Sequence, residues 1–234
     1  MASVKNFVVP RSDQMETGIR EVQVRIGPLD LAGTLLMPGG AHSLVVFAHG
    51  SGSSRLSPRN VKVAKALASQ GMATLLFDLL LPAEEANRSN VFDINLLAER
   101  LIGVVRWSDR EPQLRGLSLG LFGASIGAAA ALVAAASLKG RIQAVVSRGG
   151  RPDLAGFALT HVTVPTLLIV GGADYGVIEL NEQALERLMS PKALRIVPGA
   201  THLFEELGAM DQVVEHASLW FSRYLIKKPI AEAS

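Results

Sequence analysis

The chain has 234 residues, of which 49% are hydrophobic and 19% charged. This length suits a single large domain with a full hydrophobic core, and no part of the chain differs clearly in composition from the rest. The 23 basic and 21 acidic residues leave a net charge of only +2. The scattered basic residues argue against nucleic acid or an anionic membrane as the partner and favour a small molecule.

The sequence contains no cysteine, which excludes disulfides, cysteine-ligated metals and a thiol nucleophile. The first ten residues hold one lysine and a short apolar patch ended by Pro10. That patch is too short for the core of a secretory signal, so we expect a cytoplasmic protein. The longest apolar run, Gly127 to Leu138, would extend only ~18 Å as a helix, too little to cross a bilayer.

The first part of the chain predicts a change from antiparallel to parallel strands. Residues 1–18 are polar and irregular, and we expect them to form a loosely held lead-in. Glu21–Ile26 alternates polar and apolar side chains, and Leu31–Met37 follows after a turn, so the two should form an antiparallel edge hairpin. Leu44–Ala48 is apolar without alternation, which indicates a central parallel strand buried on both faces.

Helices and strands alternate from there on. An N-cap serine and a first-turn proline predict a helix over residues 57–70, and Ala73–Asp78 predicts a buried strand. An amphipathic pattern indicates a second helix over residues 93–109. Between this strand and this helix, the polar segment Leu79–Phe92 should be a loop that forms one wall of a pocket, since the chain is too short for a large inserted lid.

The most informative stretch reads Gly123-Ala124-Ser125-Ile126-Gly127. An apolar segment with strand character precedes it and an alanine-rich segment follows, so Ser125 should stand at a sharp turn between strand and helix. A serine at such a turn takes a strained backbone conformation, and its small neighbours let strand and helix pack closely. Its hydroxyl is then exposed above the sheet, close to the free N–H groups at the helix start.

A dinucleotide-binding turn also lies between a strand and a helix, and it is the main alternative to this nucleophile elbow. The glycines here, Gly120, Gly123 and Gly127, do not follow the spacing of that motif. The next predicted strand, Ile142–Val146, also ends without the acidic residue that would bind a ribose. The nucleotide interpretation is therefore the weaker one.

The second half of the chain continues the alternation. Because the carboxyl ends of parallel strands lie along one edge of a sheet, the loops that follow these strands should meet there. A serine, an acid and a histidine reach this edge in chain order, as Ser125, Asp174 and His202. The expected elements are strands at Ile142–Val146, Pro165–Val170 and Leu194–Val197, helices at Ile178–Met189 and Met210–Ile226, and a polar tail at 227–234.

Four segments carry a family resemblance: H-G-S-G-S-S at 49–54, G-A-S-I-G at 123–127, L-L-I-V-G-G-A-D at 167–174 and P-G-A-T-H-L-F-E-E at 198–206. They resemble the α/β-hydrolase superfamily and, within it, the dienelactone hydrolase-like group of small serine hydrolases. The last two are similar to hydrolase domains that some proteins fuse to a phosphoribosyltransferase domain. Dienelactone hydrolases proper use a cysteine where this chain has Ser125, so their lactone specificity is not carried over.

The resemblance implies one α/β-hydrolase domain over residues 19–226. Its sheet should have about eight mostly parallel strands with an antiparallel N-terminal edge, helices on both faces and no large lid. In the implied reaction, His202 accepts the proton of Ser125 as the hydroxyl attacks an ester carbonyl, and Asp174 orients the imidazole. Glu179 is close enough in sequence to compete with Asp174 for this role. No cofactor and no metal is needed.

The oxyanion of this reaction would be held by backbone N–H groups. One would come from Ile126 and the second from Ser51 or Gly52. His49 precedes this loop, and we expect it to orient the loop by hydrogen bonding more than to transfer protons, with a contact to substrate as a further possibility.

Two arginines leave the strand beside the elbow, in the loop after Ile142–Val146. Arg148 and Arg151 could clamp a substrate carboxylate in bidentate fashion. The simpler interpretation, which we favour, pairs them with Asp153 or with Glu84 and Glu85 across the cleft.

The predicted activity is hydrolysis of small or short-chain carboxylic esters, with lactones as a further possibility. Acyl transfer or perhydrolysis with the same three residues stays open, because it differs only in which nucleophile reaches the acyl-enzyme. A catalytically silent binding module on this fold is a third hypothesis. The sequence is compatible with a monomer or with a homodimer that pairs through the edge strand Glu21–Ile26.

Overall fold

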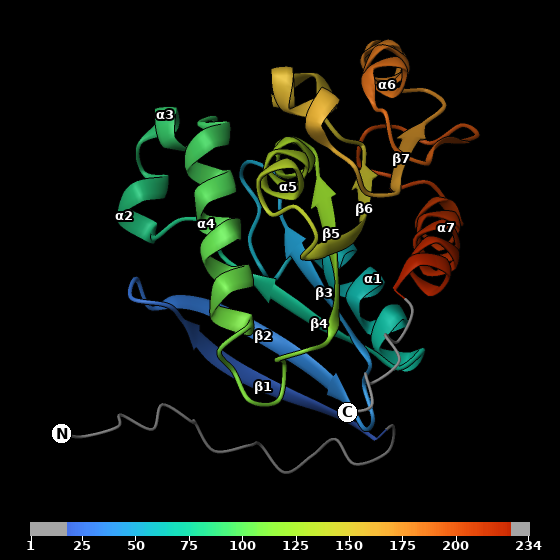
Figure 1. The fold of residues 1–234 in the computed structure, drawn as a ribbon. Coiled ribbons are helices and arrows are strands. Elements are labelled where there is room, and N and C mark those ends of the chain that lie inside the picture. The colour runs from blue at the N-terminus through green and yellow to red at the C-terminus, as the bar shows by residue number, and fades with distance from the viewer. Residues whose placement is uncertain (1–17, 226–234) are drawn as a thin grey trace, which may run out of the picture.

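The computed structural model describes residues 18–225 and contains one eight-stranded sheet (Figure 1). The predicted tail at 227–234 and nearly all of the predicted lead-in at 1–18 lie outside the described residues. The strands follow the order β1-β2-β4-β3-β5-β6-β7-β8 across the sheet. Their bounds are β1 Ile19–Ile26, β2 Leu31–Pro38, β3 Ser43–Ala48, β4 Met72–Phe77, β5 Ser118–Ala124, β6 Ile142–Arg148, β7 Thr166–Gly171 and β8 Lys192–Val197.

The N-terminal hairpin is antiparallel and lies at the edge of the sheet, as its alternating pattern predicts. Strand β1 pairs with β2 from Ile19 opposite Pro38 to Ile26 opposite Leu31, and β2 pairs antiparallel with β4. All the remaining pairs, from β4 through β3 and β5 to β8, are parallel. The predicted mostly parallel sheet with an antiparallel N-terminal edge is confirmed.

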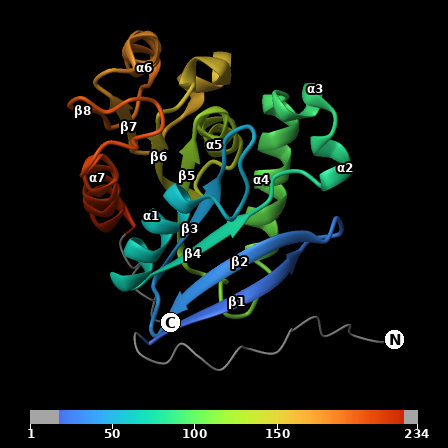
Figure 2. The ribbon, with the colours of Figure 1, turned by 180° about the vertical axis from the view of Figure 1, so that it is seen from behind.

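Helices cover both faces of the sheet and divide the core into two layers. Leucines and alanines of α4 and α5 pack on one face, together with residues of α6, and side chains of α1 and α7 pack on the other. Figures 1 and 2 show these two faces from opposite sides. The bounds are α1 Pro58–Ser69, α2 Pro82–Glu85, α3 Arg88–Val91, α4 Ile94–Ser108, α5 Ile126–Ser137, α6 Tyr175–Arg187 and α7 Ala209–Tyr224, with a 3-10 helix η1 at Pro152–His161.

The structure corrects several details of the predicted elements. The segment Leu79–Phe92 is not a plain loop, because it forms the two four-residue helices α2 and α3. Strand β6 runs on to Arg148, two residues past the predicted end at Val146. The residues after His202 form turns, and α7 begins at Ala209, one residue before the predicted start of this helix at Met210.

No helix among the described residues is long and apolar enough to cross a membrane. The alanine-rich helix α5 is buried between the sheet and its neighbouring helices, with nine of its residues in the core.

Candidate active site

Ser125 stands at a strained turn between β5 and α5. Its backbone has φ 52° and ψ −123°, a region that residues other than glycine rarely adopt. Two glycines permit the close packing around it. A Cβ at Gly123 would lie 2.4 Å from the Cα of Ala128, and one at Gly127 would lie 2.3 Å from the carbonyl oxygen of Ala48. The missing side chains therefore bring β3, β5 and α5 together at this point, as the pattern of small residues predicts.

Replacing Gly127 by alanine should push α5 away from the end of β3. We expect Gly127→Ala to lower the free energy of unfolding by ~1–3 kcal/mol and to lower ester turnover at the same time. Gly103→Ala is the matched control, because a Cβ at Gly103, on the exposed side of α4, would meet nothing within 4 Å. Urea denaturation of both variants measures the effect, and equal stability of the two would contradict the packing argument.

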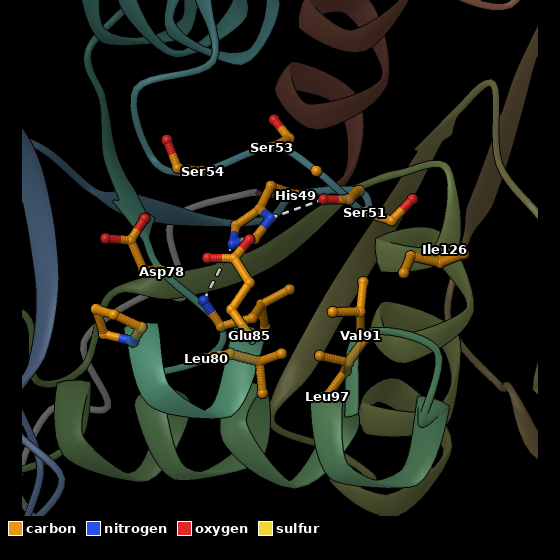
Figure 3. A pocket seen from close by; sticks show the side chains of 14 residues that line it. His49, Ser51, Ser53, Ser54, Asp78, Leu80, Glu85, Val91, Leu97 and Ile126 are labelled. Carbon is orange, nitrogen blue, oxygen red and sulfur yellow. Dashed lines mark hydrogen bonds between the residues drawn. The ribbon is translucent and has the colours of Figure 1, made fainter. Parts of the chain in front are cut away.

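The loop after β3 also comes close to Ser125. A Cβ at Gly50 would lie 3.0 Å from the Cβ of Ser125. His49 holds this loop, since its Nε2 accepts a hydrogen bond from the N–H of Leu79 at 3.1 Å and its Nδ1 lies 2.9 Å from the carbonyl oxygen of Gly50. Figure 3 shows both contacts. With both ring nitrogens engaged by backbone groups, His49 connects the loops after β3 and β4.

Asp174 and His202 lie side by side at the carboxyl ends of β7 and β8. The Nδ1 of His202 is 2.7 Å from Oδ2 of Asp174, and their side chains are 39% and 17% exposed. Gly171 allows this approach, since a Cβ there would lie 2.3 Å from the carbonyl oxygen of Ala200. The competing acid, Glu179, is exposed on α6. In the structure, therefore, His202 is hydrogen-bonded to Asp174, which is the acid that the sequence favours.

The last residues of β6 bridge the serine and the histidine. The N–H of Ser125 donates to the carbonyl oxygen of Arg148 at 3.2 Å, and the next residue, Gly149, packs against the histidine. A Cβ at Gly149 would lie 3.2 Å from the His202 carbonyl oxygen and 3.7 Å from its Cε1. Within residues 18–225, no hydrogen bond joins the Ser125 hydroxyl to the imidazole. Such contacts are often long in ligand-free enzymes and tighten when substrate binds.

Neither arginine is available to clamp an anion. Arg151 makes two hydrogen bonds to Asp153, at 2.9 and 2.8 Å, and the hydrogen bond to that carboxylate raises the pKa of the guanidinium. Arg148 is only 6% exposed, so its side chain is buried. Its Nη2 donates to Oδ1 of Asn60 at 3.4 Å, and its guanidinium lies 5.8 Å from the centroid of the Phe204 ring.

Burial, together with the nearby charge of Arg59, lowers the pKa of Arg148 to about 10. The predicted partners Glu84 and Glu85 do not reach either arginine, because Glu84 pairs with Arg100 and no ion pair joins Glu85 to any described residue.

We expect Arg148→Met to keep the stability of the wild type at neutral pH. The lowered pKa in the folded state means that the charge opposes folding at neutral pH, and this cost begins to fall only as the pH rises through about 10. At ~1.4 kcal/mol per unit, the cost is about 3 kcal/mol, which offsets the lost contacts with Asn60 and Phe204. Urea denaturation tests this, and a loss of more than ~2 kcal/mol would show that the charge stabilises the fold.

A small hollow of about 100 Å³, open to solvent, lies beside the start of α5. It is lined by the loop after β3, by residues from the β4 end to α4, and by Ile126 (Figure 3). Ser51 and Gly52, the proposed oxyanion residues, are part of this lining, whereas Ser125, Asp174 and His202 are not. Residues of the segment 79–92 form part of this lining, where the sequence predicts one wall of a pocket, whereas the contribution of Leu97, which lies on α4, was not predicted. Among the described residues, no group of three or more histidines and acids could hold a metal ion.

Solved structures with the same fold define the class of this protein as an α/β-hydrolase. Est1E from Butyrivibrio proteoclasticus is 16% identical, matches 88% of this chain and 98% of its own, and superimposes with a TM-score of 0.71. Dienelactone hydrolase from Anabaena variabilis is 54% identical, matches 89% of this chain and 100% of its own, and has a TM-score of 0.85. The chain belongs to the dienelactone hydrolase family.

A curated relative supports the second resemblance seen in the sequence. Putative phosphoribosyl transferase Rv0571c from Mycobacterium tuberculosis is 57% identical over 205 residues, which are 88% of this chain and 46% of the relative. The chain thus spans about half the length of the curated relatives that it matches. No family model matches the sequence.

Proposed function

We propose that this protein is a serine hydrolase that cleaves carboxylic esters through an acyl-enzyme on Ser125. Two observations support the proposal: a strained serine at the turn between β5 and α5, and a hydrogen-bonded Asp174–His202 pair in the loops after β7 and β8 of the same sheet. The family supports hydrolysis in general, and the Anabaena relative is named as a dienelactone hydrolase. The serine mechanism and the ester substrate are our inference from the residues.

In the first half of the reaction, Nε2 of His202 takes the proton of the Ser125 hydroxyl as Oγ attacks the ester carbonyl carbon. Asp174 accepts a hydrogen bond from Nδ1–H, which fixes the tautomer and stabilises the imidazolium. The N–H of Ile126 and that of Ser51 or Gly52 bind the oxyanion of the tetrahedral intermediate. Collapse of this intermediate transfers the proton from Nε2 to the departing alkoxide, so the alcohol leaves and the acyl-enzyme stays.

In the second half, a water molecule gives its proton to Nε2 of His202 and attacks the acyl-enzyme. The same N–H groups bind the second oxyanion, and the proton returns to Ser125 as the carboxylic acid departs. Every step uses groups that already lie at one edge of the sheet. The hollow beside Ile126, with Leu80 and Leu97 in its wall, favours small or short-chain esters.

A panel of p-nitrophenyl esters of increasing acyl length tests the proposal. We expect release of nitrophenolate with the highest kcat/KM for short chains, and no turnover across the panel would contradict the proposal. Adding alcohol or hydrogen peroxide to the same assays separates hydrolysis from acyl transfer and perhydrolysis. Formation of a new ester or a peracid at the expense of the free acid would favour the transferase alternative.

A further inference from the structure

The hollow beside Ile126 is placed to receive part of the substrate. In the proposed reaction, the carbonyl oxygen is held between Ile126 and the loop at Ser51 and Gly52, and these residues form one wall of the hollow. A chain that extends from that carbonyl therefore reaches the opposite wall, which α2, α3 and α4 supply. The charge on this opposite wall then decides which substrates fit.

The charged residues that line the hollow are all acidic. The lining contains two carboxylates, those of Asp78 and Glu85, and no lysine or arginine. Asp78 is neutralised by Arg55, which makes an ion pair with it and also donates its backbone N–H at 2.8 Å. His49 adds no positive charge in this arrangement, because its Nε2 accepts the hydrogen bond from Leu79.

Glu85 is the carboxylate that keeps its charge unpaired. It is exposed on α2, and among residues 18–225 neither an ion pair nor a side-chain hydrogen bond involves it. Its neighbour Glu84 contrasts with it, since Glu84 pairs with Arg100 and accepts from the N–H of Leu81. Figure 3 shows the Glu85 side chain rising from its helix toward the loop that carries His49 and the serines.

The arginines that could have reversed this charge are occupied elsewhere. Arg148 is buried against Asn60 and Phe204, and Arg151 is paired with Asp153. A carboxylate at the end of an acyl chain would therefore meet Glu85 with no cation to bind it. A cationic group at the same place could pair with the free Glu85 carboxylate, next to the apolar side chains of the lining.

We propose that Glu85 makes the hollow a subsite for the positively charged end of an ester substrate, and that it disfavours anionic acyl groups. The substrate class is thus short-chain esters that carry an amine or a quaternary ammonium a few bonds from the carbonyl. The inference rests on the ester hydrolysis proposed above. It differs from that proposal because it concerns the order of preference among esters and not the ability to cleave them.

Three p-nitrophenyl esters of equal chain length and similar shape test the subsite. Their acyl chains are butanoyl groups that end in trimethylammonium, tert-butyl or sulfonate. The wild type should have the highest kcat/KM for the cationic ester and the lowest for the anionic one. Exchange of Glu85 for glutamine should reduce the ratio of cationic to anionic kcat/KM about 10-fold at low salt, and added salt should weaken the preference of the wild type.

Two further variants make the test specific. Glu85→Lys should reverse the order of the charged esters, whereas Glu99→Gln, which changes an exposed carboxylate of α4 outside the hollow, should leave all three rates unchanged. If the tert-butyl ester is cleaved but the charge ratio is the same in the wild type and in Glu85→Gln, the subsite is wrong and ester hydrolysis stands. If none of the three esters is cleaved, the proposed function itself fails.

Discussion

Ser125→Ala is expected to lower kcat for p-nitrophenyl esters by about 10⁴- to 10⁶-fold, because loss of the nucleophile leaves only the oxyanion donors and substrate binding. The folded state should be unaffected, since alanine and serine carry similar strain at φ 52°. Initial rates with a short-chain ester and thermal melting of the same preparation measure both quantities.

Ser137→Ala is the matched control for this variant. Ser137 is the last residue of the same helix, α5. Its exposed hydroxyl donates a hydrogen bond only to the carbonyl oxygen of Val133. It should keep the rate of the wild type. Residual turnover of Ser125→Ala within 10-fold of the control would mean that another group attacks the ester.

Asp174→Asn is expected to lower kcat by about 10³- to 10⁴-fold with little change in KM, because an amide cannot stabilise the imidazolium and can hold the ring in the wrong tautomer. The hydrogen bond of 2.7 Å between Asp174 and Nδ1 of His202 is the contact that the substitution alters. Steady-state kinetics with the preferred p-nitrophenyl ester gives the two parameters separately.

Glu179→Gln is the complementary test of Asp174 as the acid that orients His202. Glu179 is the acid nearest in sequence that could take the place of Asp174, and it lies exposed on α6. Its substitution should leave kcat unchanged. The assignment would be wrong if Glu179→Gln lost activity while Asp174→Asn kept it.

The strained turn at Ser125 could be predicted because its cause is local. A strand, small residues on both sides of Ser125 and an alanine-rich helix all lie within one short stretch, and each step of that pattern has a steric reason. The strained φ of Ser125 and the contacts around Gly123 and Gly127 follow from it. Likewise, a parallel sheet brings the ends of β7 and β8 to one edge, so the meeting of Asp174 with His202 required only the order of the strands.

The surroundings of Arg148 could not be predicted in the same way. Side chains alternate between the two faces of a strand, so the side to which an arginine points depends on where the strand ends. Predicting the end of β6 at Val146 placed Arg148 in a loop facing the cleft. The strand continues to Arg148, whose side chain enters the layer between the sheet and α1 and contacts Asn60 there.

The helical structure of the wall opposite Ile126 could not be predicted, for a different reason. Helices α2 and α3 have four residues each, too short for a repeating apolar pattern, so only their polar character is visible in the sequence. Their capping depends on specific contacts, such as the Glu84 carboxylate that accepts from the N–H of Leu81. As a result, Glu85 appears in the sequence as one of several acids, and its position in the hollow becomes clear only in three dimensions.

The measurement closest to the central claim is covalent labelling with a fluorophosphonate, followed by intact mass spectrometry and peptide mapping. We expect one adduct per chain on Ser125, no adduct in Ser125→Ala, and labelling slowed by orders of magnitude in His202→Ala. An unmodified wild-type chain under conditions where a known serine hydrolase reacts fully, or an adduct on another residue, would contradict it.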